Sequence, residues 1–186
     1  MGIARRPAVA GPGFAHRVRG APSRYGLAVS RLYDFTAAFW ASVEGAPRPR
    51  IDVLLVEDDP GDALLVAEAL ADRPVDLHVV RDGAEALGFL LRSGRYSQAP
   101  KPNLVLLDLN LPGLSGHEVL EQVKADPGLR SLPVVVLTSS AAESDLVASY
   151  RLRANAYVRK PLTAGSFTEV VHQIDEFFGS VARLPS

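Results

Sequence analysis

The chain has 186 residues, with 20 lysines and arginines against 21 aspartates and glutamates, a formal net charge of -1 and no cysteine. This balance argues against a dedicated nucleic-acid binder, and the lack of cysteine excludes disulfides and thiolate sites and fits a cytoplasmic protein. No apolar run approaches the roughly 18 residues that span a bilayer, so no membrane association is expected.

Residues 1–50 differ in composition from the rest of the chain. They hold eight arginines, six glycines and five prolines but only two acidic residues, whereas residues 51–186 hold 12 basic and 19 acidic residues. Apart from a short helical pattern of apolar residues at 28–43, they show no regular spacing of apolar residues. Prolines and glycines also interrupt any apolar core of a signal sequence. We therefore expect a disordered basic extension, or a start codon assigned too early, and no export signal.

From residue 51 onwards, short apolar segments alternate with helical patterns. Buried strands are predicted by runs of branched and aliphatic residues at 53–56, 77–80, 104–107, 133–137 and 156–158. Between them, apolar residues recur at helical spacing, as at Gly116, Val119, Leu120 and Val123. The order of elements is therefore a strand followed by a helix, repeated five times.

Polar residues mark where several of these helices begin. Asp59 lies directly before a proline, an arrangement typical of an N-cap followed by the first helical residue. Ser115 with Glu118, and Ser140 with Glu143, have the spacing of capping boxes. We expect each pair to start a helix.

Five such units predict an α/β fold with a five-stranded parallel sheet and helices on both faces. The compact open-sheet solution is the flavodoxin-like strand order 2-1-3-4-5. In such sheets ligands bind beyond the carboxyl ends of the strands, at the switch point between the first and third strands.

Polar residues follow the predicted strands at that edge: Glu57 and Asp58, Asp108, Thr138 and Lys160. A carboxylate such as Asp108, inside an apolar run, is costly to desolvate unless something compensates its charge. Clustered carboxylates without histidine or thiolate ligands favour Mg²⁺ over zinc or copper. The set also suits phosphoryl transfer to an aspartate, in which the lysine and the cation neutralise phosphoryl oxygens and the hydroxyl binds the product.

Five motifs in order resemble the receiver domain of two-component response regulators, the CheY-like superfamily. They are VEDDP at 56–60, DGAEAL at 82–87, LVLLDLNLPGLSG at 104–116, VVVLTSS at 134–140 and ANAYVRKP at 154–161. The resemblance predicts a receiver domain over residues 51–180, followed by a short tail at 181–186.

The resemblance implies a role for each acidic residue of the site. Asp108 is implied to be the phosphoacceptor. Glu57, Asp58 and Asp108 are implied to bind Mg²⁺, together with the backbone carbonyl of Asn110. The protein is therefore expected to be a signalling phosphoacceptor, with self-catalysed phosphotransfer and autodephosphorylation as its only chemistry.

The resemblance also implies how phosphorylation is sensed. Thr138 and Lys160 are expected to contact the phosphoryl group, and Tyr157 is expected to be the aromatic that turns inward. The peptide bond from Lys160 to Pro161 is expected to be cis. Arg153 stands where many receivers have glycine, so an altered turn is expected there.

The segment SGRYSQAPKP at 93–102 is similar, more narrowly, to stand-alone regulators that pair with bacterial phytochromes. This implies a sensor histidine kinase of the phytochrome-like type as partner. A histidine phosphotransfer protein or a second copy of the chain would be a further partner. Signalling is expected to occur by protein contact, without an output domain after the last helix and without nucleic acid.

Two other classes remain as alternatives. A phosphatase of the haloacid-dehalogenase type needs a second acid two residues after its nucleophile, where this chain has Asn110. A flavodoxin-like FMN binder needs a cradle of backbone amides after the first strand, where this chain has carboxylates. Turnover of phosphate esters or a yellow colour of the purified protein would identify them.

Overall fold

The computed structural model describes residues 49–182, so the predicted extension, with its helical pattern at 28–43, lies almost wholly outside the described residues. The strands are β1 (Ile51–Val56), β2 (Val75–Val80), β3 (Leu104–Leu107), β4 (Val134–Thr138) and β5 (Ala156–Arg159). The helices are α2 (Pro60–Leu70), α3 (Gly83–Leu90), α4 (Gly116–Ala125), α5 (Glu143–Arg151) and α6 (Ala164–Glu176), with a 3₁₀ turn at Gly94–Tyr96 and a π-helical turn at Phe177–Val181. In this part of the chain no helix is long and apolar enough to cross a membrane.

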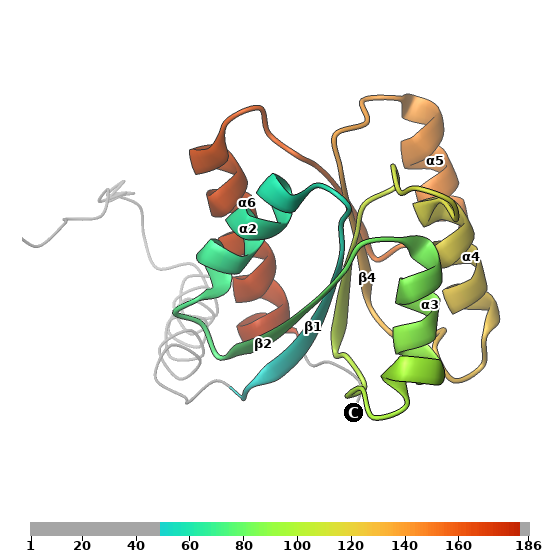
Figure 1. Ribbon diagram of the computed structural model, residues 1–186. Coiled ribbons are helices and arrows are strands. Elements are labelled where there is room, and N and C mark those ends of the chain that lie inside the picture. The colour runs from blue at the N-terminus through green and yellow to red at the C-terminus, as the bar shows by residue number, and fades with distance from the viewer. Residues whose placement is uncertain (1–48, 183–186) are drawn as a thin grey trace, which may run out of the picture. The chain divides into compact units, whose positions relative to one another are not determined.

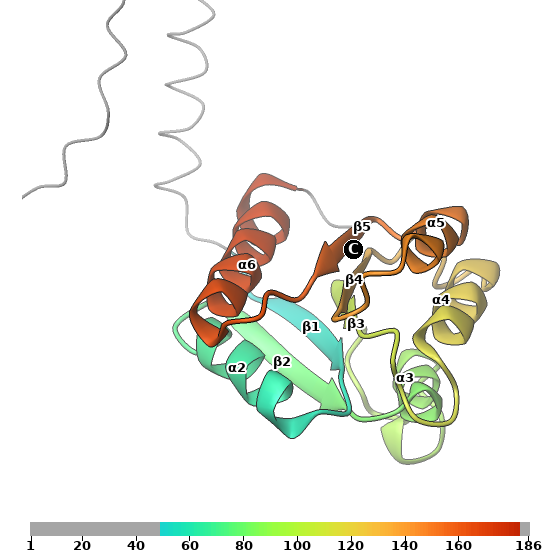
Figure 2. The same ribbon diagram turned by 90° about the horizontal axis from the view of Figure 1, so that it is seen from above.

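All five predicted strands are present, with ends that differ from the prediction by at most two residues. They form one parallel sheet in the order β2-β1-β3-β4-β5, which confirms the predicted fold class and topology (Figures 1 and 2). β1 and β3 are neighbours in register, with Val56 opposite Leu107. The residues that follow these two strands therefore lie side by side at the carboxyl edge of the sheet.

Helices cover both faces of the sheet. Successive residues of a strand point to opposite faces, so each strand contributes apolar side chains to both layers of helices. On β1, Leu54 and Val56 pack in a cluster with residues of α3 and α4, whereas Val53 and Leu55 pack with residues of α2 and α6. Figures 1 and 2 show α2 and α6 on one face, and α3, α4 and α5 on the other. Each buried aliphatic side chain stabilises this arrangement by roughly 1.5–3 kcal/mol, so the strand ends are held on a rigid support.

Two of the three predicted helix starts are confirmed. Asp59 caps α2, its side chain accepting hydrogen bonds from two backbone N–H groups, and Ser115 and Glu118 form a reciprocal capping box at α4. The predicted box between Ser140 and Glu143 is wrong. The N-cap of α5 is Ala142, two residues after Ser140, so the helix begins at Glu143 itself. The Ser140 hydroxyl instead accepts a hydrogen bond from the backbone N–H of Ala142.

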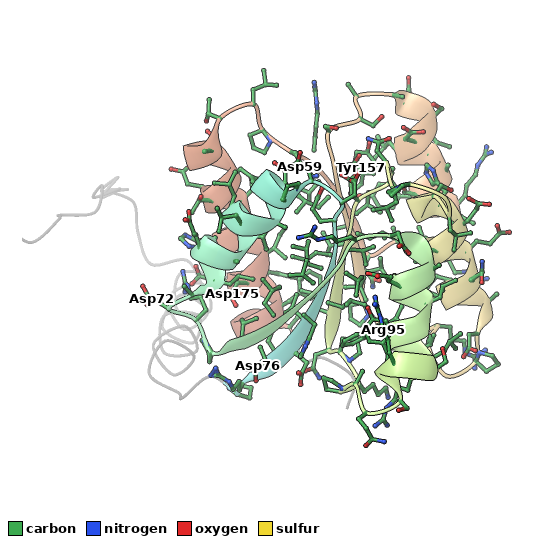
Figure 3. The ribbon with its side chains drawn as sticks, viewed as in Figure 1. Asp59, Asp72, Asp76, Arg95, Tyr157 and Asp175 are labelled. Carbon is green, nitrogen blue, oxygen red and sulfur yellow. The ribbon has the colours of Figure 1, made fainter. Side chains whose placement is uncertain are left out.

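The segment at 93–102 is anchored by a cation and two aromatic rings. The Arg95 guanidinium bonds the carboxylate of Glu85 and lies over the ring of Tyr96, 4.8 Å from its centroid. The Tyr96 ring in turn packs 5.5 Å from that of Phe89 in α3. Figure 3 shows Arg95 beside α3, so this segment is fixed to the face that α3 covers.

Arg153 occupies the turn after α5 in a conformation that favours glycine. The Ala154 N–H donates to the Ser149 carbonyl at 2.9 Å and the Arg153 N–H to that of Tyr150 at 3.0 Å, the pairing of a Schellman motif. This pairing places Arg153 at φ +65°, in the left-handed region. A residue with a Cβ is strained there by about 1–2 kcal/mol.

Replacing Arg153 with glycine is expected to raise the free energy of unfolding by about 0.5–1 kcal/mol, because the lost strain exceeds the added entropy of the unfolded chain. Arg151→Gly, two residues earlier in α5, removes the same type of side chain from a helical position. This substitution is expected to lower the free energy of unfolding by about 0.5–1 kcal/mol. Urea unfolding of both variants measures the difference. A loss of stability in Arg153→Gly would contradict the strain at this turn.

Candidate functional site

Three carboxylates converge where β1 and β3 end. Glu57, Asp58 and Asp108 each place an oxygen within 4.8 Å of the others. The Glu57 N–H bonds the carbonyl of Val80 and the Asp108 N–H that of Val56, so both residues continue the strand pairing. Glu57 is 2% exposed and Asp108 4%, whereas Asp58 is exposed. Two buried carboxylates at this distance require a compensating cation.

Lys160, which follows β5, supplies one positive charge to this cluster. Its Nζ donates to Glu57 Oε2 at 2.6 Å, to Asp108 Oδ2 at 2.6 Å and to Asp62 Oδ2 at 2.9 Å. An ammonium has three N–H donors, so all three are used. Burial alone would lower the pKa of Lys160, but its hydrogen bonds to the three carboxylates raise the pKa above its ordinary range. The group therefore remains charged.

Asp62 belongs to the site, but it was not predicted from the sequence. It lies in the first turn of α2, and its side chain is 36% exposed. Its partner Lys160 is 98 residues away in the sequence, which no local pattern encodes. One feature of the sequence could have indicated it: Asp62 lies four residues after Asp58, about one helical turn beyond the acidic loop. This spacing keeps Asp62 at the carboxyl edge of the sheet.

The Glu57 carboxyl is the strongly perturbed acid of the site. Burial raises its pKa from 4.5 to about 7, against the lowering effect of Lys160. The unfolded chain releases this proton near the lower value and the folded chain near the higher one. Because the folded state binds more protons in between, the free energy of unfolding falls as the pH rises through this window.

In the metal-free protein we expect this fall to be roughly 3 kcal/mol between about pH 4.5 and 7.5, from about 1.36 kcal/mol per pKa unit. Glu57→Gln removes the titrating group and is expected to flatten the profile. Urea unfolding in EDTA across this range tests both proteins. An equally steep profile in the variant would assign the titration to another group.

The loop after Asp108 is tightly packed against the start of α4. The Asn110 N–H donates to Asp108 Oδ1 at 3.1 Å, which orients the carboxylate. A Cβ on Gly116 would lie 2.1 Å from the Asp108 carbonyl oxygen, so only glycine fits there. The backbone carbonyl of Asn110, an expected metal ligand, remains a prediction.

Thr138 and Tyr157 are joined through Ser140. Thr138 is fully buried at the end of β4, and its Oγ1 accepts from the Ser140 N–H at 3.3 Å and from Asn110 Nδ2 at 3.4 Å. The Tyr157 hydroxyl donates to the Ser140 carbonyl at 3.1 Å. Figure 3 places Tyr157 and Asp59 at one edge of the sheet and Asp76 at the other. Thr138 and Tyr157 therefore lie at the same edge as the acidic cluster.

The donors of the acidic cluster fit a hard divalent cation. All are carboxylate oxygens, which suit magnesium, calcium or manganese, and no histidine or thiolate belongs to the group in residues 49–182.

Residues 53–172 match the model of the response regulator receiver domain. The chain belongs to the response regulator receiver family. Receivers are signalling modules of two-component systems that bind a divalent metal and are phosphorylated by histidine kinases. The resemblance drawn from the five sequence motifs is thereby confirmed.

This receiver is similar to two regulators over most of their length. The response regulator Rcp1 of Synechocystis sp. is 43% identical over 136 residues, 72% of this chain and 92% of Rcp1. The probable methanogenesis regulatory protein FilR2 of Methanothrix harundinacea is 39% identical over 136 residues, 72% of this chain and 86% of FilR2. The narrower likeness to phytochrome-associated regulators is confirmed by Rcp1 and the solved structures below.

Two solved structures share the receiver fold at comparable identity. The phosphorylated cyanobacterial phytochrome response regulator RcpA is 44% identical with a TM-score of 0.73, over 74% of this chain and 99% of RcpA. The Mn²⁺-bound form of Rcp1 is 42% identical with a TM-score of 0.71, over 73% of this chain and 99% of Rcp1.

The prediction of a cis peptide bond between Lys160 and Pro161, which was based on the resemblance to receivers, is wrong. Residues 49–182 contain no cis peptide bond, so the bond between Lys160 and Pro161 is trans. The trans form is favoured at proline by about 0.5–1 kcal/mol. In this conformation Lys160 already reaches all three carboxylates, so its contacts do not require the cis bond.

Proposed function

We propose that this receiver accepts a phosphoryl group on Asp108 from a histidine kinase and signals by protein contact. The observation that supports this most is the setting of Asp108. It is a buried carboxylate at the end of a central strand, bonded to the Lys160 ammonium and next to two further carboxylates. A nucleophile, a cation for the phosphoryl oxygens and ligands for a metal are thus within one small site.

In the proposed reaction a carboxylate oxygen of Asp108 attacks the phosphorus of a phosphohistidine. The P–N bond breaks, its electron pair returns to the imidazole nitrogen, and an acyl phosphate forms. Lys160 neutralises charge on the phosphoryl oxygens. Glu57, Asp58, Asp108 and the backbone carbonyl of Asn110 would hold Mg²⁺, which supplies further positive charge to those oxygens when bound.

Thr138 and Tyr157 are the proposed switch. Phosphorylation adds acceptor oxygens beside Asp108, which attract the Thr138 hydroxyl. Because Ser140 bonds both Thr138 and Tyr157, movement of Thr138 disturbs the bond that holds the tyrosine hydroxyl. The surface formed by α5, β5 and α6 would change in consequence, and a kinase, a target or a second copy would bind there.

The proposed partners follow from the relatives. A phytochrome-like sensor histidine kinase is supported by the likeness to RcpA, a phytochrome response regulator by its name. A histidine phosphotransfer protein is the proposed acceptor if the phosphate is passed on. We propose that the receiver domain comprises residues 51–180, with 1–50 and 181–186 as appendages.

The alternatives receive less support. The side chain of Asn110, where a phosphatase of the haloacid-dehalogenase type needs an acid, donates to Thr138. The loop after β1 presents Glu57 and Asp58, which repel the phosphate of FMN in the absence of a metal.

The test is incubation with a small phosphodonor such as acetyl phosphate and Mg²⁺, followed by intact-protein mass spectrometry. We expect a mass gain of one phosphoryl group that requires Mg²⁺ and is prevented by EDTA. Transfer from candidate kinases then identifies the partner. Absence of labelling under all these conditions would contradict the proposed function.

A further inference from the structure

Asp62 is the one carboxylate bonded to Lys160 that the proposed chemistry does not use. Its Oδ2 lies 2.9 Å from Lys160 Nζ. Glu57 and Asp108, the other two partners of this ammonium, both belong to the cluster that fits a metal, and Asp62 does not.

Glu57 and Asp108 therefore face two cations at once. Lys160 bonds one oxygen of each of these carboxylates at 2.6 Å. Because like charges repel, occupation of the cluster by a divalent cation weakens the bonds that these carboxylates make to the ammonium. Without a further partner, Lys160 would either compete with the metal or leave the site.

We propose that Asp62 is a positioning residue that retains the Lys160 ammonium at the rim of the site when Glu57 and Asp108 bind the metal. The inference rests on the proposed function and deepens it. It assigns Lys160 two sets of partners, three carboxylates in the metal-free site and chiefly Asp62 in the metal-bound one. The ammonium then stays within reach of the phosphoryl oxygens that Asp108 receives.

The start of α2 is built to hold Asp62 in place. Asp59 caps the helix and accepts the Asp62 N–H at 2.9 Å, and Pro60 occupies the first helical position. The Asp62 side chain is 36% exposed, whereas that of Glu57 is 2% exposed. Asp62 therefore carries its charge at a smaller desolvation cost, and α2 presents it from a fixed position.

Removing the Asp62 charge is expected to weaken metal binding. In Asp62→Asn the ammonium keeps only Glu57 and Asp108 as charged partners, so it competes more strongly with Mg²⁺ for these two carboxylates. We expect the Kd for Mg²⁺ to rise about five-fold, the upper range for a partly exposed ion pair. Asp62→Glu retains the charge and is expected to restore Kd to within about two-fold of wild type.

The experiment is calorimetric titration of the full chain with Mg²⁺ alone, in a double-mutant cycle with Lys160→Met. If Asp62 acts through Lys160, Asp62→Asn should change Kd by less than about two-fold once Lys160 is absent. Glu68→Gln removes a charge from an exposed position of the same helix and should leave Kd unchanged.

An effect of Asp62→Asn that is equally large without Lys160, or that Asp62→Glu fails to reverse, would overturn the inference. Should Lys160→Met not fold, the comparison of Asp62→Asn with Asp62→Glu decides alone. Failure of the wild type to bind Mg²⁺ would instead count against the proposed metal site, so the two failures are distinguishable.

Discussion

Asp108→Asn is expected to abolish labelling by acetyl phosphate and Mg²⁺, with a loss of at least about 100-fold, as when a nucleophile is removed. The amide nitrogen cannot replace the attacking oxygen, and the amide oxygen is a poor nucleophile. The substitution keeps the shape of a side chain that is 4% exposed, so the fold should be retained. Intact mass after a timed incubation gives the rate.

The matched control is Asp59→Asn, which makes the same chemical change one residue beyond the acidic pair. The Asp59 side chain caps α2, and asparagine is an equally good N-cap. We expect labelling to remain within about two-fold of wild type, because this carboxylate is outside the metal cluster. Equal losses in both variants would indicate that the effect is not specific to Asp108.

Lys160→Met is expected to destabilise the metal-free protein by about 3 kcal/mol at neutral pH, because it leaves Glu57 and Asp108 buried without their cation. The value is at the lower end for a broken buried pair, since Glu57, with a pKa of about 7, can take up a proton. Mg²⁺ should recover much of the loss by supplying the missing charge. Urea unfolding with and without Mg²⁺ measures both effects.

Arg159→Met is the control for this change. Arg159 is the last residue of β5 and directly precedes Lys160, but it is exposed. It removes one positive charge from the surface, so we expect an effect within about 0.5 kcal/mol that does not depend on Mg²⁺. A loss in Lys160→Met no larger than in Arg159→Met would contradict the role of Lys160 as the cation of the cluster.

The fold and the acidic cluster were predictable because both depend on periodicity. Runs such as 104–107 are long enough for a buried strand and end at a charge, and parallel strands bring their carboxyl ends to one edge. Asp108 could therefore be placed beside Glu57 and Asp58 without knowledge of any side-chain conformation. The likeness to receiver domains then supplied the expected role of each residue.

Other contacts depend on details that a sequence pattern does not contain. The helix after β4 starts at Glu143, so Ser140 binds Thr138 and Asp145 rather than capping it. The bond between Asp62 and Lys160 exists because α2 begins at the same edge of the sheet at which β5 ends, which follows only from the packed structure. The trans bond before Pro161 likewise reflects a local choice between two conformations of similar energy.

The central claim is that Asp108 carries the phosphoryl group, and the location of the acyl phosphate tests it most directly. After labelling with acetyl phosphate and Mg²⁺, borohydride reduces an aspartyl phosphate to homoserine, which peptide mass spectrometry can locate. We predict homoserine at position 108 and unmodified Glu57, Asp58 and Asp62. Homoserine at another aspartate, or none at 108 in a labelled protein, would contradict the account.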